Sequence, residues 1–351
     1  MTGSVTTNGV VGSPYTMKNR IINGAMMIDQ RNAGAAITQT TSLLYGADRW
    51  FTYGSVASKF TAQQQTSVVP AGFTYATKIT SSSAYTVGAS EYFLFGQRIE
   101  GYNIADLGWG TANAKTITLS FWVYSSLTGT FGGQLENSNG TRSYPFSYTI
   151  SSANTWEQKT VTITGDTTGS WAGTTSTGIQ VCFSLGSGST VSGTSGSWSS
   201  TEYFSATGAT SVVGTNGATF YITGVQLEVG STATAFEWRP YGMELQLCQR
   251  YYELMPMTSF TGAAGGTLIS LTAKFSVQKR TDATIAVAKG SGTDFNLFRP
   301  GSELTNTSVN VSANYSDKDS MMIEFGTFTF SNNQAWSGRR GTGQFGASAE
   351  L

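Results

Sequence analysis

This sequence is dominated by short segments in which apolar and polar residues alternate. The clearest is KTITLSFWVY at 115–124, whose apolar positions Ile117, Leu119, Phe121 and Val123 share one face. GIQVCFSL at 178–185 repeats the pattern, with Gln180, Cys182 and Ser184 on the polar face. A period of two in β-branched and aromatic residues indicates strands with one buried face. Because Gly, Ser and Asn turns separate such segments and helical patterns are rare, the chain is predicted to be an all-β, antiparallel sandwich.

Charge and residue usage exclude several classes of protein. The 20 Lys and Arg residues balance the 20 Asp and Glu residues, and histidine is absent. A neutral chain has no basic field for nucleic acid or anionic membranes. Without histidine there is no Ser/His/Asp triad and no usual His-containing metal site, so paired carboxylates are the main catalytic route left. Cys182 and Cys248 cannot build a disulfide framework and are expected to be free thiols.

The first 18 residues are small and polar and are predicted to form an arm ahead of a β domain at 19–241. They show neither the basic nor the apolar region of a secretory signal, so none is expected. No segment approaches the ~20 consecutive apolar residues of a membrane-spanning helix.

One strand contains a change of register. In ATFYITGVQLEV at 218–229 the apolar positions change parity across Thr223–Gly224. A β-bulge at Gly224 would return both halves to one face, since glycine tolerates that geometry. The alternative is two short strands joined by a kink.

A single helical pattern follows Pro240. We predict a connecting helix at 242–256 and a smaller β domain at 257–351. The helix would carry two neighbouring apolar stripes, which is wider than one packing partner needs. It is therefore either wedged between two domains or packed around a symmetry axis. Its packing residues are predicted to be Met243, Leu245, Leu247, Cys248, Tyr251 and Tyr252.

Aromatic residues in predicted loops are candidates for glycan contact, because sugar C–H faces stack on Trp and Tyr rings. They are Trp109, Trp171, Trp198, Tyr102 and Tyr144. The alternative is that most of them fold back as lids over the ends of the sandwich. Near the C-terminus, Trp336, Arg339 and Arg340 are either a surface for anionic polysaccharide or a solvated turn.

Two acidic pairs are candidates for chemistry. Asp317 and Asp319 in SDKDS make up half of an oxygen-rich cation loop, so a structural calcium is a hypothesis, although the EF-hand pattern is not met. Glu228 and Glu237 are either a carboxylate pair for sugar hydrolysis or structural groups. In the structural interpretation, which we favour, Glu237 and Arg239 pair at the corner between strand and helix.

Three passages together resemble a family of phage tail-fibre and tail proteins. They are NRIINGAMMIDQRNAG at 19–34, ADRW at 47–50 and GVQLEVGSTATAFEWRPYGMELQLCQRYYE at 224–253, and the final AEL is similar to the family's usual chain end. The last of the three is long and specific, and the resemblance covers about residues 19 to 254. Met26 and Met27 stand where the family usually has an aromatic residue, and the Ser/Gly-rich loops around Trp171 and Trp198 are particular to this chain.

The resemblance implies a jelly roll similar to carbohydrate-binding modules, followed by a variable C-terminal domain, in a homotrimeric virion fibre. It implies a non-enzymatic structural protein of a tailed bacteriophage that attaches to host surface polysaccharide as a receptor-binding tail fibre. The arm at 1–18 would contact other virion proteins. The alternatives are a head-decoration fibre, a depolymerising tail spike, and the binding module of a secreted hydrolase.

Overall fold

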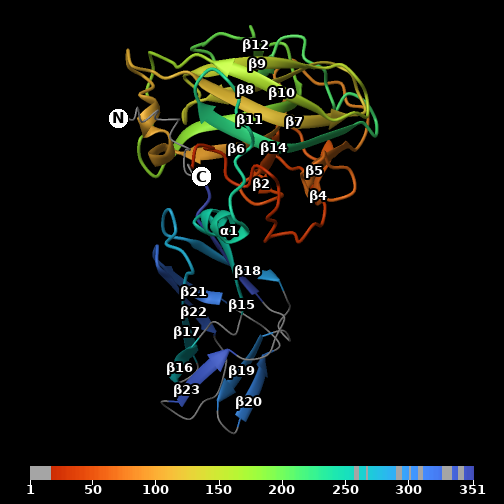
Figure 1. The fold of residues 1–351 in the computed structure, drawn as a ribbon. Coiled ribbons are helices and arrows are strands. Elements are labelled where there is room, and N and C mark those ends of the chain that lie inside the picture. The colour runs from red at the N-terminus through yellow and green to blue at the C-terminus, as the bar shows by residue number, and fades with distance from the viewer. Residues whose placement is uncertain are drawn as a thin grey trace, which may run out of the picture.

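The computed structural model describes residues 17–256, 261–265, 268–289, 295–299, 302–306, 311–325, 334–338 and 344–351. Two six-stranded antiparallel sheets form the larger body, and a smaller β domain follows on the far side of helix α1 (Figure 1). The larger body is a jelly-roll sandwich, as the sequence predicted. No helix in the described part of the chain is long and apolar enough to span a bilayer.

The first sheet has the order β1-β4-β5-β14-β7-β10 and the second the order β2-β3-β6-β11-β8-β9. The first comprises β1 (Ile37–Thr38), β4 (Phe60–Gln65), β5 (Ala76–Ser81), β14 (Thr219–Val229), β7 (Ile117–Ser125) and β10 (Glu157–Ile163). The second comprises β2 (Leu44–Tyr45), β3 (Phe51–Gly54), β6 (Tyr92–Glu100), β11 (Thr177–Ser187), β8 (Gly129–Glu136) and β9 (Ser143–Ile150). The short helices η1 (Gly101–Asn103) and η2 (Ala105–Leu107) and the small parallel pair β12 (Ser192–Gly193) and β13 (Ser205–Ala206) complete it.

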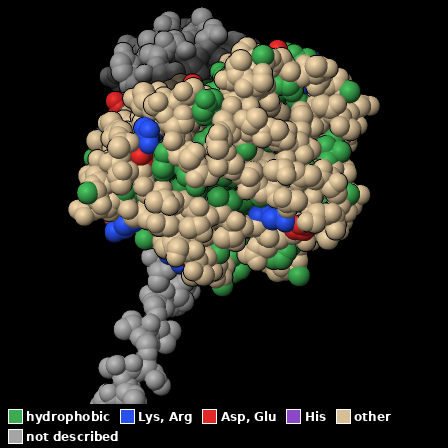
Figure 2. All heavy atoms as spheres, turned by 90° about the horizontal axis from the view of Figure 1, so that it is seen from above, with side chains coloured by type: hydrophobic (Ala, Val, Ile, Leu, Met, Phe, Trp, Pro, Cys, Tyr) green, Lys and Arg blue, Asp and Glu red, His purple; other side chains and the backbone are tan. Residues whose placement is uncertain are grey.

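The alternating strands bury the predicted faces between the two sheets. In β7 and β11, which contain the two clearest alternating segments, the apolar positions are fully buried in one continuous core: Ile117, Leu119, Phe121, Val123, Ile179, Val181, Phe183 and Leu185. Seen from above, the face of the jelly roll is made mostly of uncharged side chains and backbone, with few charges (Figure 2).

The predicted bulge at Gly224 is confirmed. Strand β14 is continuous, and its register against β7 shifts between Thr223 and Gln226. Gly224 has φ +61°, and an ideal Cβ there would lie 2.6 Å from Cζ of Phe73. Both the left-handed backbone and the close approach of the ring require glycine.

The predicted helix is too long. Helix α1 runs only over Tyr241–Gln249, and Tyr252–Pro256 is strand β15. Strand β15 pairs with β24 (Gln344–Ser348), which also pairs with β18 (Thr284–Lys289). Pairing with the end of the chain overrides the local helical pattern, because each backbone group must find a partner. The local sequence pattern does not reveal this pairing, because β24 lies about 90 residues further along the chain.

A seven-stranded antiparallel sheet forms the rest of the C-terminal domain, in the order β20-β19-β23-β16-β17-β22-β21. These strands are β20 (Ser302–Asn306), β19 (Phe295–Arg299), β23 (Gln334–Gly338), β16 (Thr261–Gly265), β17 (Leu268–Lys274), β22 (Ser320–Phe325) and β21 (Val311–Ser316).

Candidate functional site

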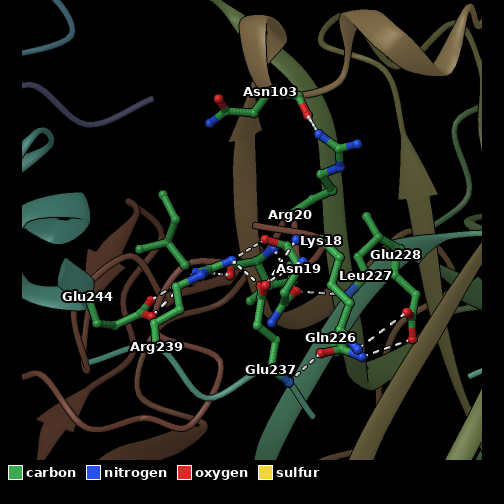
Figure 3. Close-up of polar contacts among 12 residues, drawn as sticks. Lys18, Asn19, Arg20, Asn103, Gln226, Leu227, Glu228, Glu237, Arg239 and Glu244 are labelled. Atoms are coloured by element: carbon green, nitrogen blue, oxygen red, sulfur yellow. Dashed lines mark hydrogen bonds and ion pairs between the residues drawn. The ribbon is translucent and has the colours of Figure 1, made fainter. Parts of the chain in front are cut away.

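Polar residues of the passage 224–253, on β14 and just after it, form a buried network with Lys18 and Asn19 (Figure 3). The two carboxylate oxygens of Glu237 accept hydrogen bonds from the backbone N–H groups of Lys18 and Asn19, at 3.1 and 3.0 Å. Arg239 forms ion pairs at 3.3 Å with Glu237 and with Glu244 of α1. The predicted pairing of Glu237 with Arg239 at this corner is therefore confirmed.

Both carboxylate oxygens of Glu228 also accept hydrogen bonds from neighbouring residues of the chain. Its Oε1 accepts hydrogen bonds from Gln226 Nε2 and the Thr234 backbone N–H, both at 2.8 Å, and its Oε2 accepts one from Thr234 Oγ1 at 2.7 Å. Because both oxygens of Glu228 and of Glu237 accept bonds from the chain, the contacts support the structural interpretation of these acids over the hydrolytic one.

The other signature passages meet at the joint between the two domains. Arg49 of ADRW is 1% exposed, forms an ion pair with Glu350, and lies 3.6 Å from the centre of the Tyr251 ring. Arg31 lies over the Tyr252 ring at 3.6 Å and reaches Glu350 at 3.1 Å. Segments far apart in sequence thus converge on one buried arginine cluster.

A second set of contacts at this joint ties α1 to the jelly roll. Arg250 binds both carboxylate oxygens of Glu100 at 2.9 and 2.7 Å, and the Tyr251 hydroxyl donates to Glu100 at 2.7 Å. Arg280 of the C-terminal domain donates to the Thr175 carbonyl at 2.7 Å. Bidentate charged pairs of this kind fix relative orientation. Arg250 and Tyr251 of the passage 224–253 therefore take part in the contacts that hold the two domains together.

The predicted helix-packing residues separate into two groups. Cys248, Tyr251 and Tyr252 are buried within one chain, the first two in a cluster with Ile22 and Ile28. They are therefore wedged between the domains, which is the first of the two predicted alternatives for these three residues. Burial raises the pKa of the Cys248 thiol, and both cysteines are free.

Met243, Leu245 and Leu247 are only partly buried on α1. Close to them, Trp238 is 45% exposed and Tyr241 is 56% exposed. Leu245 and Leu247 pack against the cluster of Cys248 and Tyr251, so the exposed apolar groups near α1 are Trp238 and Tyr241.

The predicted aromatic platforms form one cluster. Trp109, Trp171 and Trp198 meet edge to face with ring centres 4.7 to 5.4 Å apart, and Tyr144 packs on Trp198 at 5.1 Å. Each indole N–H donates to a partner inside the chain: Lys115 O, Asp166 Oδ2 and Thr168 O, and Thr164 O. Trp109 and Tyr144 are each 6% exposed. The cluster packs against the core as a lid, so these two rings are not open platforms.

The remaining aromatic and basic candidates lie apart from this cluster. Tyr102 is 61% exposed on η1. Trp336 lies on β23, whose side chains are outside the description, and Arg339 and Arg340 lie outside the described residues.

A polar hollow of about 330 Å³ opens on the outer face of the second sheet. Its floor is formed by Arg98 of β6, Gln180 of β11 and Glu136 at the end of β8. Arg98 Nε donates to Gln180 Oε1 at 2.7 Å, and Gln180 Nε2 donates in turn to Glu136 Oε1. The rim comprises Asn137, Ser138, Asn139, Gly140, Thr177 and Glu202. Small-molecule sites range from about 300 to 1,000 Å³, so the hollow has the size of a small ligand site.

Glu136 is the most buried acidic group of the hollow. The residue is 6% exposed and its Oε2 atom is buried, while the side-chain amide of Gln134 lies close enough to lower the pKa of Glu136. Burial, followed by the nearby negative charge of Glu202, raises the pKa of Glu136 to about 7. Glu202 is exposed at the rim, where Gly140 permits its approach: an ideal Cβ on Gly140 would lie 2.7 Å from Glu202 Oε1.

Aromatic side chains continue the same face beyond the hollow. Tyr92 stacks on Phe204 with ring centres 4.0 Å apart and contacts Tyr53 at 5.7 Å. Burial, a hydrogen bond with Tyr53 and the charges of Glu202 and Glu136 raise the pKa of Tyr92. Tyr53 and Tyr92 are only partly buried.

The acidic turn at 317–319 binds its own backbone. Asp317 Oδ1 accepts hydrogen bonds from the N–H groups of Asp319 and Ser320, at 2.7 and 2.6 Å, and these bonds lower the pKa of Asp317. Within the described ranges, no group of three or more acidic or cysteine side chains converges as a metal site would require.

Sequence reasoning missed the hollow. Gln180 was assigned correctly to the outer face of its strand, but Arg98, Glu136 and Glu202 come from three separate segments. The available signal was weak: outward polar residues on strands whose other face is apolar.

No family model and no curated protein matches the chain. Several solved structures are similar over part of it. The enzymatically active domain of tailspike protein 4 from bacteriophage CBA120 matches at 13% identity and a TM-score of 0.33, over 62% of this chain and only 22% of that one. A putative sugar-binding protein from Bacteroides thetaiotaomicron matches at 14% and 0.36, over 60% and 100% of the two chains. A family 11 carbohydrate-binding module from Clostridium thermocellum matches at 10% and 0.28, over 58% and 99%. Likenesses at such low identity and TM-score carry no inference about ligand or role.

Proposed function

We propose that this chain is a non-enzymatic structural protein of a tailed-phage virion, a tail fibre whose jelly roll binds host surface glycans. The observation that carries the glycan-binding part is the polar hollow on the second sheet, which is lined by charged, amide and hydroxyl side chains. A sugar hydroxyl both donates and accepts hydrogen bonds, which suits such a lining. Tyr53 and Tyr92 beside the hollow add rings on which a sugar face can stack.

The virion role rests on the resemblance of the three signature passages to tail-fibre proteins. Arg49 and Arg250 of these passages hold the joint between the domains through ion pairs with Glu350 and Glu100. A rigid joint suits a fibre that must present a receptor-binding face at a fixed orientation. Immunogold labelling of virions tests this role and distinguishes tail from head attachment. A particle without label would contradict it.

A homotrimer is part of the proposal. The partly buried Met243, together with the exposed Trp238 and Tyr241, leaves apolar surface beside α1 for neighbouring copies. Light scattering on a sizing column tests this directly. Three copies of a 37.2 kDa chain are expected, and a clean monomer would remove the fibre assembly while leaving glycan binding in place.

The experiment that tests glycan binding is an array of immobilised oligosaccharides probed with the full chain. Saturable binding to one structural group of glycans is expected. Absence of binding across the array would refute the proposed function.

A further inference from the structure

We infer that the polar hollow selects uncharged, hydroxyl-rich glycans and rejects acidic ones. This inference rests on the proposed function and names the ligand class of that same site. It concerns the hollow lined by Arg98, Glu136, Gln180 and Glu202 together with its rim.

The first argument is the charge of the lining. With Glu202 ionised and Arg98 positive, the lining sums to zero while Glu136 is protonated and to −1 once Glu136 ionises, above pH 7. The two carboxylates already disfavour each other, since the charge of Glu202 contributes, after burial, to the raised pKa of Glu136. A uronate or sialate would bring a third carboxylate into the same space, and like charges at close range repel.

The second argument is that the single cation is already engaged. Arg98 Nε donates to Gln180 Oε1 at 2.7 Å, and its Nη1 donates to the Leu351 carbonyl at 2.8 Å. Recognition of a carboxylate usually uses the guanidinium fork in a bidentate pair. In Arg98 two sides of that fork are turned to the chain, so the strongest anion receptor in the hollow is not presented to a ligand.

The third argument is that the remaining groups suit hydroxyls. Ser138 and Asn139 are exposed on the β8–β9 hairpin, and Thr177 is partly buried at the start of β11. These neutral side chains can both donate and accept hydrogen bonds, as sugar hydroxyls do.

The groups facing Glu136 come from every neighbouring element. They are Arg98 and Tyr92 of β6, Gln134 of β8, Gln180 and the buried Cys182 of β11, and Glu202 of the β12–β13 loop. Arg98 is the one cation among them, so the balance of charge does not reverse when all these groups are counted.

The test compares variants on an array in which neutral glucose, galactose, mannose and N-acetylglucosamine oligomers stand beside uronic-acid and sialylated ones. The full chain is expected to bind neutral probes. Asn139→Ala should weaken that binding about tenfold, as loss of a ligand hydrogen bond does. Glu202→Gln should reduce the discrimination against acidic probes, and it is safe for folding because the side chain is exposed. Asp282→Asn, an equal charge change at another exposed position, is the matched control and should leave the profile unchanged.

The outcomes separate this inference from the proposed function. Binding that is confined to acidic probes would overturn the inference and leave glycan binding standing. Neutral binding that neither Asn139→Ala nor Glu202→Gln alters would do the same, because the ligand would then sit elsewhere. No binding to any probe would overturn both.

Discussion

Replacing Glu136 with glutamine should make the folded protein more stable at neutral and alkaline pH. In the native chain this carboxyl is almost completely buried at the hollow, and burial followed by the charge of Glu202 raises its pKa to about 7. The folded state therefore holds this proton more tightly than the unfolded chain, whose glutamates ionise near 4.5. Stability contributed by the neutral carboxyl is full below pH 4.5 and is lost as pH rises through 7.

The expected magnitude follows from that difference. At ~1.4 kcal/mol per pH unit, ionising this group in the folded state costs about 3 kcal/mol above pH 7. Glutamine cannot ionise and keeps an oxygen that can accept the hydrogen bond from Gln180 Nε2. Glu136→Gln should therefore stabilise the chain by about 3 kcal/mol at pH 8 and change little at pH 4.

Urea unfolding at pH 4, 6 and 8, followed by tryptophan fluorescence, measures this difference, because Trp109, Trp171 and Trp198 report on the jelly roll. Asp282→Asn serves as a control for loss of one exposed charge. If Glu136→Gln unfolds at the same urea concentration as the native chain at pH 8, or at a lower one, the carboxylate is not destabilised by its surroundings and the account of the hollow is wrong.

Three further substitutions test the packing, each measured as a change in the free energy of unfolding by urea. Gly224→Ala should cost about 2–3 kcal/mol, since it places a Cβ on a left-handed backbone against Phe73; an unchanged midpoint would argue against the bulge. Trp109→Ala should cost about 3–5 kcal/mol by opening a cavity under the aromatic lid, and a loss below 1 kcal/mol would contradict its burial. Arg239→Met should cost about 3–5 kcal/mol, because Glu237 and Glu244 would both lose their ion pair with Arg239 in a buried network. A neutral result there would mean that the network carries no buried charge.

The sandwich was predictable because the alternation of apolar and polar residues that specifies each strand is a local feature of the sequence. Alternation at 115–124 and 178–185 assigns each side chain to a face without reference to the rest of the chain, and the parity change at Gly224 marks the bulge. The end of α1 was not predictable, since Tyr252–Pro256 has a helical pattern but pairs with a strand about 90 residues later.

The candidate site was less accessible than the fold. Trp109 and Tyr144 have the composition of a glycan platform, yet their rings lie in the core, because loop residues return to the sandwich end when burial is favourable. Glu136 and Glu202 approach each other only after the β8–β9 hairpin and the β12–β13 loop are in place. No spacing in the sequence marks such a meeting.

The central claim is that a glycan occupies the hollow on the second sheet. Hydrogen–deuterium exchange of the full chain, with and without the neutral oligosaccharide bound most strongly on the array, tests it most directly. The account predicts protection confined to peptides that cover 136–140 and 177–180, because these segments line the hollow. Protection located only in the C-terminal domain, or only around the aromatic lid at Trp198, would contradict it.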